Sequence, residues 1–216
     1  LHVQDENNQL VPLFLNSDGR YRWSDSAFIF SVENGELTTS IPMTEVQAGT
    51  TLRDAYMAAQ AKYFPATGTL PDTLFFTMPQ YNTWIELMYN QNQEDILRYA
   101  HAIIDNGFPP GVLMIDDNWQ RYYGNFDFKA ERFSDPKAMV DELHALGFKV
   151  MLWICPFVSP DSPEFRDLEA KGYLLKNPHG GTAVLNWWNG YSACYDLTNP
   201  AAAAHFVGVL KQVQAD

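Results

Sequence analysis

Residues 111–119 read Gly-Val-Leu-Met-Ile-Asp-Asp-Asn-Trp, so four apolar residues run directly into two adjacent carboxylates. The apolar run, Val112 to Ile115, follows a Pro-Pro-Gly break and is typical of a strand covered on both faces, as in parallel sheets. In α/β barrels, the polar residues that follow such strands lie at the rim that carries the chemistry. We therefore expect Asp116 and Asp117 at the carboxyl end of a buried parallel strand.

Strands and helices alternate on both sides of this stretch. The expected elements, in chain order, are a first strand within residues 73–78 or 83–87, a helix over 96–104 closed by Gly107, the strand at 112–115, a helix from Pro136 to Gly147, a strand over 149–155, a helix from Pro163 to Gly172 and a last helix from Pro200. Residues 177–194, rich in Gly, Asn and Trp, are expected to form a long loop. This alternation predicts an α/β fold with a parallel sheet and right-handed crossovers. Because three strands cannot close an eight-stranded barrel, residues 66–216 are expected to form only the front part of a (β/α)8 TIM barrel, strands 1–3 with their helices.

Residues 1–48 have the pattern of an antiparallel sheet. Phe28, Phe30 and Val32 alternate and are followed by Asn34-Gly35, the strongest short hairpin signal. The segment is too short for a complete sandwich. We expect it to be the end of an N-terminal antiparallel β-sandwich.

A helix and a linker follow this β segment. Thr51 and Asp54 form a capping pair at the helix start, and Pro65 stops the helix. Its expected buried face consists of Leu52, Ala55, Tyr56, Ala59 and Tyr63. Residues 1–65 are thus expected to hold the sandwich end plus a connecting helix. The barrel part is expected over 66–216, with a linker at 66–72.

Composition excludes several classes of function. The net charge of −12 argues against a nucleic-acid partner, and no stretch approaches the roughly 18 apolar residues of a membrane span. The five histidines and two cysteines show no metal-ligand spacing, and no phosphate or dinucleotide Gly motif is present, so neither metal nor cofactor is expected. Cys155 and Cys194 are expected to be unpaired thiols. The oligomeric state is left open, and an extracytoplasmic location is the expectation for the compartment.

The two adjacent aspartates are the first candidate ligand-binding residues. As ionised acceptors, Asp116 and Asp117 can bind vicinal sugar hydroxyls, each charged hydrogen bond contributing about 1.5–3 kcal/mol. Neighbouring side chains within a strand point to opposite faces, so both can serve one ligand only if the strand has ended at Ile115 or Asp116. The alternative is a strand-to-loop turn in which one Asp caps a following helix or turn.

Aromatic residues near the strand ends are the second group of candidates. Trp153 falls near the end of the next expected strand, where a tryptophan is more often core than ligand wall. Trp188, beside Trp187 in a polar loop, is a stronger indication of a flat surface for stacking a sugar. Three further candidates for the same rim follow the first strand: Trp84, Glu86 and Tyr89.

Six motifs, in order and with sensible spacing, resemble those of glycoside hydrolase family 31. They are residues 16–24 (Asn-Ser-Asp-Gly-Arg-Tyr-Arg-Trp-Ser), 48–56 (Ala-Gly-Thr-Thr-Leu-Arg-Asp-Ala-Tyr), 115–119 (Ile-Asp-Asp-Asn-Trp), 133–136 (Phe-Ser-Asp-Pro), 152–156 (Leu-Trp-Ile-Cys-Pro) and 195–200 (Tyr-Asp-Leu-Thr-Asn-Pro). The similarity covers nearly the whole chain. It implies a retaining α-glycosidase on a (β/α)8 barrel, whose substrate is an oligosaccharide or α-glycoside.

The resemblance also implies roles for single residues. Asp116 resembles the strand-two aspartate that binds sugar hydroxyls in the −1 subsite, Trp153 and Trp188 its tryptophan walls, and Tyr89 the aromatic residue after strand one. The second aspartate, Asp117, departs from the α-glucosidase pattern. An Asp-Asp pair followed by Trp is similar to α-galactosidases of families 27 and 36 and to some family 31 members. An α-galactosidase is therefore the first expectation, with an α-glucosidase or α-xylosidase as the alternative.

The reactive groups are expected elsewhere. A retaining enzyme needs two carboxyl groups about 5–5.5 Å apart, one nucleophile and one acid/base. The resemblance implies that the nucleophile ends strand four and that the acid/base lies later, so neither is expected among residues 1–216. A non-catalytic carbohydrate-binding or interaction protein is the alternative of another class. A metal-dependent barrel hydrolase is weakened by the missing ligand spacing.

Overall fold

The computed structural model describes residues 11–26 and 28–215. The chain divides into two compact units, Leu1–Leu70 and Pro71–Asp216, and each is described by itself. The boundary falls within residues 66–72, the predicted linker. The first ten residues of the predicted N-terminal domain lie outside the described ranges. None of the helices in those ranges is long and apolar enough to span a membrane.

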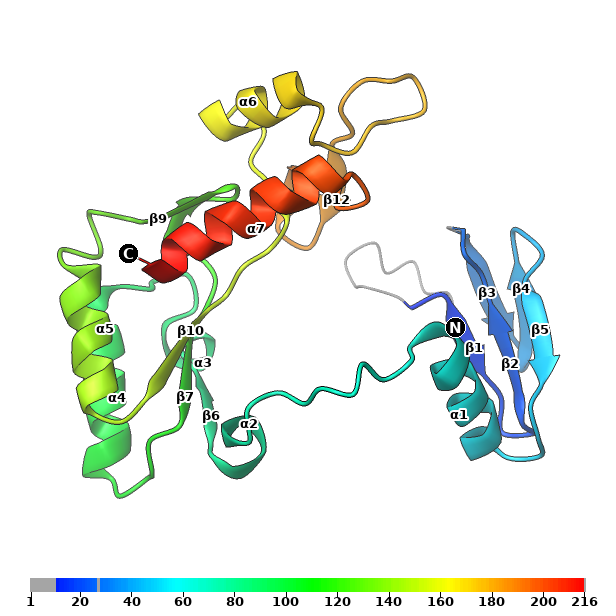
Figure 1. Ribbon diagram of the computed structural model, residues 1–216, viewed down its shortest axis with the longest axis horizontal. Coiled ribbons are helices and arrows are strands. Elements are labelled where there is room, and N and C mark those ends of the chain that lie inside the picture. Colours follow the sequence, from blue (N-terminus) through cyan, green and yellow to red (C-terminus); the bar gives the residue numbers. More distant parts are fainter. Residues whose placement is uncertain (1–10, 27, 216) are drawn as a thin grey trace. The chain divides into compact units, whose positions relative to one another are not determined.

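The first unit contains two small antiparallel sheets (Figure 1). The three-stranded sheet has the order β1-β2-β5, with β1 at Leu13–Leu15, β2 at Arg20–Trp23 and β5 at Thr44–Gln47. The second sheet pairs β3 (Phe30–Glu33) with β4 (Glu36–Thr39). Asn34 and Gly35 connect β3 to β4 with positive φ angles of 52° and 82°, as a two-residue hairpin turn requires. The predicted hairpin is confirmed.

Helix α1 (Leu52–Tyr63) packs on the three-stranded sheet. The predicted capping pair is confirmed, because the Asp54 backbone N–H donates to Thr51 Oγ1 at 3.2 Å and the Thr51 N–H donates to Asp54 Oδ2 at 3.0 Å. The predicted buried face is partly wrong. Ala55 is buried against Tyr21, whereas the bulky Leu52 and Tyr56 are exposed. The physical reason is that the helix approaches the small sheet closely through its alanines, which leaves only a narrow buried stripe. The exposure of Leu52 and Tyr56 shows that the helical period alone does not predict how wide the buried face of a helix is.

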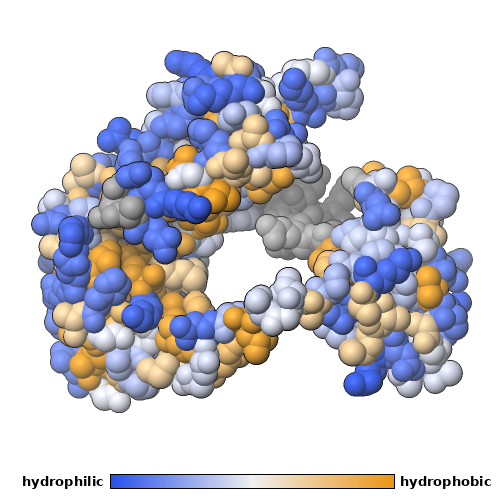
Figure 2. Space-filling model, viewed as in Figure 1, coloured by the Kyte–Doolittle hydropathy of each residue, from blue (hydrophilic) through white to orange (hydrophobic). Residues whose placement is uncertain are grey.

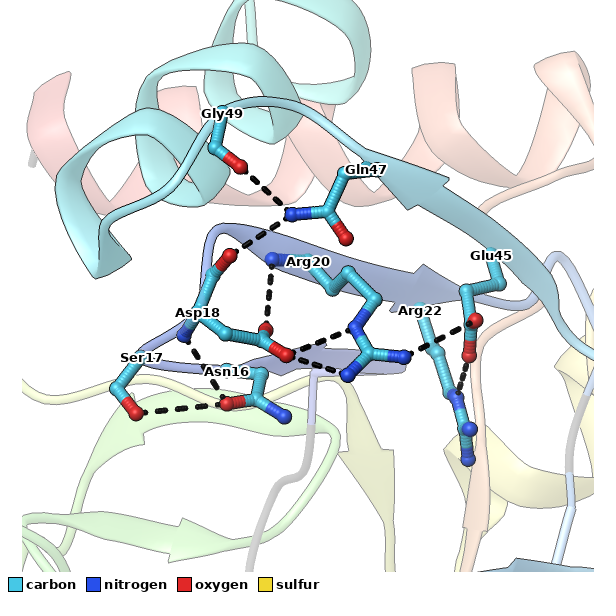
Figure 3. Close-up of polar contacts among 8 residues, drawn as sticks. All are labelled: Asn16, Ser17, Asp18, Arg20, Arg22, Glu45, Gln47 and Gly49. Carbon is cyan, nitrogen blue, oxygen red and sulfur yellow. Dashed lines mark hydrogen bonds and ion pairs between the residues drawn. The ribbon is translucent and has the colours of Figure 1, made fainter.

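Polar contacts join the loop before β2 to the start of α1 (Figure 3). Gln47 Nε2 donates to the carbonyl oxygens of Asp18, at 2.8 Å, and Gly49, at 2.6 Å. Gly19 has φ +87°, and a Cβ there would lie 2.3 Å from the Gly49 carbonyl oxygen. Arg20 donates from Nε to Asp18 at 3.0 Å. The motifs at 16–24 and 48–56 therefore touch each other, and Gly19 permits the close backbone approach.

The second unit is built on a parallel sheet with the strand order β10-β7-β6 (Figure 1). The strand β7 is Val112–Ile115, as predicted, and it lies between β6 (Gln80–Asn82) and β10 (Lys149–Leu152). Helices α4 (Gln93–Asp105) and α5 (Pro136–Ala145) lie side by side along this sheet and bury Ile96 and Leu143 in its core. The α/β fold is thereby confirmed. The caps predicted at Asp135 and Ser162 are also present.

The predicted first strand is wrong in both of its candidate segments. Residues 73–78 contain the short helix α2 (Leu74–Thr77) and residues 83–87 the short helix α3 (Trp84–Leu87), and β6 lies between them. Helix α2 begins where Asp72 Oδ1 accepts the Leu74 N–H at 2.9 Å. Short apolar runs do not distinguish helix from strand. The segment Gln80–Asn82 becomes a strand only through its parallel pairing with β7.

The segments between the parallel strands and their helices hold short antiparallel strands that the sequence did not predict. One hairpin pairs β8 (Gln120–Tyr122) with β9 (Asn125–Phe128). The predicted long loop at 177–194 instead contains β12 (Leu185–Trp187) and β13 (Gly190–Cys194), and β13 also pairs with β11 (Phe157–Val158). Helices α6 (Pro163–Lys171) and α7 (Pro200–Ala215) complete the unit.

Apolar side chains stay exposed beside the β6 edge of this unit. Within the described ranges β6 and β10 each have one strand neighbour, β7. Phe76 of α2 is 68% exposed and Ile85 of α3 is 84% exposed. Figure 2 shows apolar surface in the region of α2. Helix α2 precedes β6 and α3 follows it, so these side chains lie near the two ends of this edge strand.

Candidate functional site

The turn after β7 holds Asp116 with one oxygen available. The Asp116 backbone N–H donates to Thr83 Oγ1 at 3.0 Å, and its Oδ1 accepts the Asp117 N–H at 2.6 Å. The residue is 8% exposed. No donor among residues 11–26 and 28–215 bonds to its Oδ2. This oxygen is also not fully buried. Asp116 therefore offers one acceptor oxygen at the carboxyl end of the sheet.

Asp117 is directed into the protein instead. It is 1% exposed, and its Oδ1 accepts the Asn118 N–H at 2.6 Å. Its Oδ2 accepts from the Tyr123 hydroxyl at 2.7 Å and from Asn189 Nδ2 at 3.5 Å. Burial raises the pKa of Asp117, while the Tyr123 and Asn118 hydrogen bonds act in the opposite direction. Both of its oxygens are thus satisfied by protein donors, and the two aspartates point to different surroundings.

Five aromatic rings form a wall next to Asp117. The Tyr123 ring packs on Trp153 and Trp187, with centroid distances of 6.2 and 5.1 Å. Trp187 stacks on Phe157 at 4.0 Å and is only 7% exposed. Trp188 meets Trp153 edge-on at 6.4 Å with an interplanar angle of 76°, and it is 46% exposed. Trp153 and Trp188 therefore keep ring surface toward solvent, as a stacking surface for an apolar ring face requires.

Asn118 ties the same turn to the loop after β6. It lies in the left-handed region with φ 76°, and its Nδ2 donates to the Tyr89 carbonyl oxygen at 2.6 Å. Lys129 donates to the Asn118 side chain, and burial lowers the pKa of Lys129. Tyr89 in turn meets Trp84 edge-on at 4.9 Å. The turn at 116–118 therefore connects the segments that follow β6 and β7.

A buried indole connects the turn to β10 as well. Trp119 is fully buried, and its Nε1 donates to the Trp153 carbonyl oxygen at 2.7 Å. The segments after all three parallel strands thus meet at residues 116–119. Parallel strands present their carboxyl ends at one edge, so this convergence follows from the topology.

The structure places the predicted site residues in three groups. Asp116 and Asp117 lie in the turn after β7, and Trp153 and Trp188 belong to the aromatic wall that Tyr123 joins to Asp117. Trp84 and Tyr89 form a second group joined to the same turn through Asn118. Glu86 stands apart. It is exposed on α3, and its charge helps to raise the pKa of Tyr99 of α4, whose main cause is burial.

Tyr123 and Asn189 are parts of the site that were not predicted from the sequence. Each occupies the two-residue turn of a hairpin, Tyr123 before Gly124 and Asn189 before Gly190, and both glycines have φ +93°. Tyr-Gly and Asn-Gly pairs between short strands are turn signals that could have located the hairpins. The sequence holds no signal that both tips contact Asp117.

Metal and thiol chemistry find no support in the described part of the chain. Residues 11–26 and 28–215 hold no group of three or more His, Cys, Asp or Glu side chains that could bind a metal ion. Cys155 and Cys194 are free thiols, as predicted. Burial raises the pKa of Cys155 to about 12, so its thiol stays protonated at neutral pH. The site instead offers a carboxylate oxygen and indole faces, which suit a neutral hydroxylated ring.

Comparison with known proteins assigns the second unit to a described family. The sequence profile of the glycosyl hydrolases family 31 TIM-barrel domain matches residues 76–216. Myogenesis-regulating glycosidase of Mus musculus is 31% identical over 154 residues, 71% of this chain and 22% of that protein. Alpha-xylosidase XylQ of Lactiplantibacillus pentosus is 27% identical over 135 residues, 61% of this chain and 18% of that protein. The chain spans about a fifth of the length of these curated relatives.

Solved structures show the same fold. A family 31 dextranase of Flavobacterium johnsoniae superposes with a TM-score of 0.68 at 18% identity, over 95% of this chain and 26% of the dextranase. A family 31 α-xylosidase from a soil metagenome superposes with a TM-score of 0.66 at 24% identity, over 94% of this chain and 30% of the xylosidase.

Proposed function

Since this chain belongs to glycosyl hydrolases family 31, we propose that the whole protein hydrolyses terminal, non-reducing α-glycosidic bonds with retention of configuration. The observation that carries the proposal is the Asp116 carboxylate, which keeps one oxygen available at the end of a parallel strand. Trp153 and Trp188 keep exposed ring surface in the adjoining aromatic wall. Carboxylate acceptors beside aromatic faces are suited to binding sugar rings.

In this proposal the second unit binds substrate. Asp116 accepts hydrogen bonds from hydroxyls of the terminal sugar, and Trp153 and Trp188 enclose its apolar faces. Tyr89 and Trp84 line the opposite side of the turn. Asp117 acts by holding the surrounding loops, because both of its oxygens accept from protein donors. Glu86 is left out of the binding set because, among the described residues, no hydrogen bond or ion pair joins it to the turn at 116–119 or to the aromatic wall; its charge acts on Tyr99 of α4 instead.

The reactive carboxyl pair is proposed to come from outside residues 1–216. A retaining mechanism needs two carboxyl groups about 5–5.5 Å apart, with room for the sugar between them. Asp117 is sealed from solvent and Asp116 is its sequence neighbour, so the two cannot flank a glycosidic bond. Within the described ranges β6 and β10 are both edge strands with β7 as their one strand neighbour, which supports further barrel strands that pair with these edges.

The sugar specificity has two candidates. The Asp116-Asp117 pair followed by Trp119 favours an α-galactoside, because of its similarity to α-galactosidases. The names of curated relatives favour an α-xyloside or α-glucoside: besides XylQ, an α-xylosidase of Emericella nidulans is 28% identical over 137 residues. We place the α-xyloside or α-glucoside first, because Asp117, on which the galactoside argument depends, already accepts hydrogen bonds from protein donors at both of its oxygens.

Hydrolysis of aryl glycosides by the full-length protein tests the proposal. The p-nitrophenyl α-galactoside, α-xyloside and α-glucoside are compared at equal concentration, and NMR follows the anomer released first. We expect turnover of one α-glycoside with retention, and a loss of roughly tenfold or more in kcat/KM in Asp116→Asn, because a charged acceptor is removed. Binding of free sugar without turnover of any glycoside would establish the non-catalytic alternative instead.

A further inference from the structure

The tips of two hairpins meet at the buried Asp117 carboxylate. The β8–β9 hairpin closes with Tyr122 opposite Asn125, which leaves Tyr123 and Gly124 as its turn. The β12–β13 hairpin closes with Trp187 opposite Gly190, which leaves Trp188 and Asn189 as its turn. The two turns lie more than sixty positions apart in sequence, and their contact at Asp117 is a property of the fold.

A directional chain of hydrogen bonds links the two tips. Asn189 Nδ2 donates to the Tyr123 hydroxyl oxygen, and the Tyr123 hydroxyl donates to Asp117 Oδ2 at 2.7 Å. Asn189 Nδ2 also lies 3.5 Å from the same Asp117 oxygen. The Tyr123 hydroxyl therefore donates to a buried carboxylate, and Asn189 in turn donates to that hydroxyl. Hydrogen bonds to ionised groups are the strong ones.

The same contacts set the position of the exposed indole. Trp188 is the neighbour of Asn189 in the turn, so an anchored Asn189 fixes the backbone that carries the Trp188 ring. The Tyr123 ring packs on Trp153 and Trp187, which both contact Trp188. Because Tyr123 joins the hydrogen bonds to the aromatic wall, a change at its hydroxyl is transmitted to the ring surface offered to ligand.

We propose that Tyr123 and Asn189 are positioning residues that close a latch on Asp117, holding the β12–β13 hairpin so that Trp188 faces the bound sugar. This inference rests on the proposed function for its kinetic consequence. The latch itself is a property of the ligand-free protein. When the hydrogen bonds of the latch break, only a fraction of the molecules presents the complete aromatic wall. The apparent affinity for sugar then falls in proportion to that fraction.

The buried Asp117 carboxylate is not explained by a contribution to stability alone. Apolar side chains of similar volume would fill the site without the desolvation of a carboxylate. The turn at Tyr123 and Gly124 packs closely against the segment around Val158. A Cβ at Gly124 would lie 2.9 Å from Val158 Cγ1, and the Ser159 N–H donates to the Tyr123 carbonyl oxygen at 2.8 Å. The arrangement holds the Tyr123 hydroxyl at one place.

Two variants of the full-length protein and two matched controls test the latch. Tyr123→Phe removes only the hydroxyl, and Asn189→Ala removes the second donor. The control Tyr122→Phe removes a hydroxyl from the neighbouring tyrosine, which interacts with Glu164 instead. The control Asn186→Ala alters an exposed residue of the same hairpin, opposite Tyr191.

The readouts are KM and kcat on the hydrolysed aryl glycoside, and near-UV circular dichroism of the ligand-free protein. We expect KM to rise about tenfold in Tyr123→Phe and Asn189→Ala with kcat within about twofold, as for loss of binding shared by ground state and transition state. The tryptophan bands of the dichroism spectrum should change in these two variants and stay unchanged in both controls.

Each outcome decides one part of the inference. Unchanged KM and an unchanged spectrum in a protein that hydrolyses its substrate would overturn the latch, even if thermal stability fell. A protein without any glycosidase activity would overturn the proposed function, and the spectra would still decide whether the latch orders the indoles. If Tyr123→Phe fails to fold, Asn189→Ala, at a half-buried turn residue, carries the test alone.

Discussion

Removing the Tyr123 hydroxyl is expected to lower the free energy of unfolding by an amount that depends on pH. In Tyr123→Phe the Asp117 carboxylate loses the donor that lies 2.7 Å from its Oδ2. A hydrogen bond to a charged group contributes about 1.5–3 kcal/mol, and one to a neutral group about 0.5–1.5 kcal/mol. Asn189 Nδ2, 3.5 Å from the same oxygen, can move closer and recover part of the loss. We therefore expect a loss of about 1.5–2 kcal/mol while Asp117 is ionised.

The sign of the pH dependence follows from the burial of Asp117. Burial raises its pKa above the ordinary value of 3.8, so the folded state binds the proton more tightly than the unfolded state. This contribution to stability is fully present below pH 3.8 and is lost as the pH rises through the folded-state pKa. The Tyr123 hydrogen bond opposes that loss by favouring the ionised form. The destabilisation by Tyr123→Phe should therefore grow as the pH rises through the same range.

Urea unfolding of the full-length protein, followed by tryptophan fluorescence, measures this dependence. The wild type, Tyr123→Phe, Asp117→Asn and the double variant form a double-mutant cycle at each pH. We expect a coupling energy between the two sites of about 1 kcal/mol or more above the folded-state pKa of Asp117, and a smaller value below it. A coupling energy that is the same at every pH, or larger at low pH, would refute the reasoning.

Three further predictions concern other parts of the chain. Gly124→Ala should lower the free energy of unfolding by at least about 1–2 kcal/mol, measured by urea unfolding, because its φ is +93° and the new Cβ would press on Val158; an unchanged midpoint would contradict the fit of this turn. Glu86→Gln should leave kcat/KM within about twofold, because Glu86 is exposed on α3, and a tenfold loss in the aryl glycoside assay would return it to the site. Residues 1–216 alone should release no nitrophenol from any aryl α-glycoside, and turnover would show that a catalytic carboxylate lies among them.

Local chemistry made much of the fold predictable. The strand Val112–Ile115 was recognisable because a parallel strand is apolar on both faces. The helix starts at Thr51, Asp135 and Ser162 were recognisable because each cap side chain accepts a backbone N–H three residues later. These signals act within a few residues, so a sequence displays them directly.

Pairing between distant segments was not predictable in the same way. The first parallel strand has the sequence Gln-Tyr-Asn and is a strand only because it pairs with β7, some thirty positions later. The more apolar flanking segments form the helices α2 and α3. Likewise, β13 lies between β11 and β12 because it pairs with residues 157–158 as well as with its hairpin partner. In each case the hydrogen bonds decide the element, and their partner is remote in sequence.

The candidate site shows the same division. Asp116, Trp153 and Trp188 were recognisable because carboxylates and tryptophans near strand ends or in polar loops are typical of ligand sites. Tyr123 and Asn189 carried only the turn signals of their glycine neighbours. Their shared contact with Asp117 depends on how two hairpins pack, and neither hairpin was predicted.

The adjacent aspartates divide two tasks that a single carboxylate could not perform. Asp116 keeps one carboxylate oxygen without a donor among the described residues, and its charge also contributes to raising the pKa of Asp117. Asp117 faces inward, where three protein donors compensate for the repulsion and for the lost solvent. The hydrogen bonds of the Asp117 carboxylate thereby hold the turn that positions the Asp116 carboxylate. A substitution at Asp117 is accordingly expected to disturb sugar binding through Asp116 and Trp188, without any direct contact between Asp117 and the sugar.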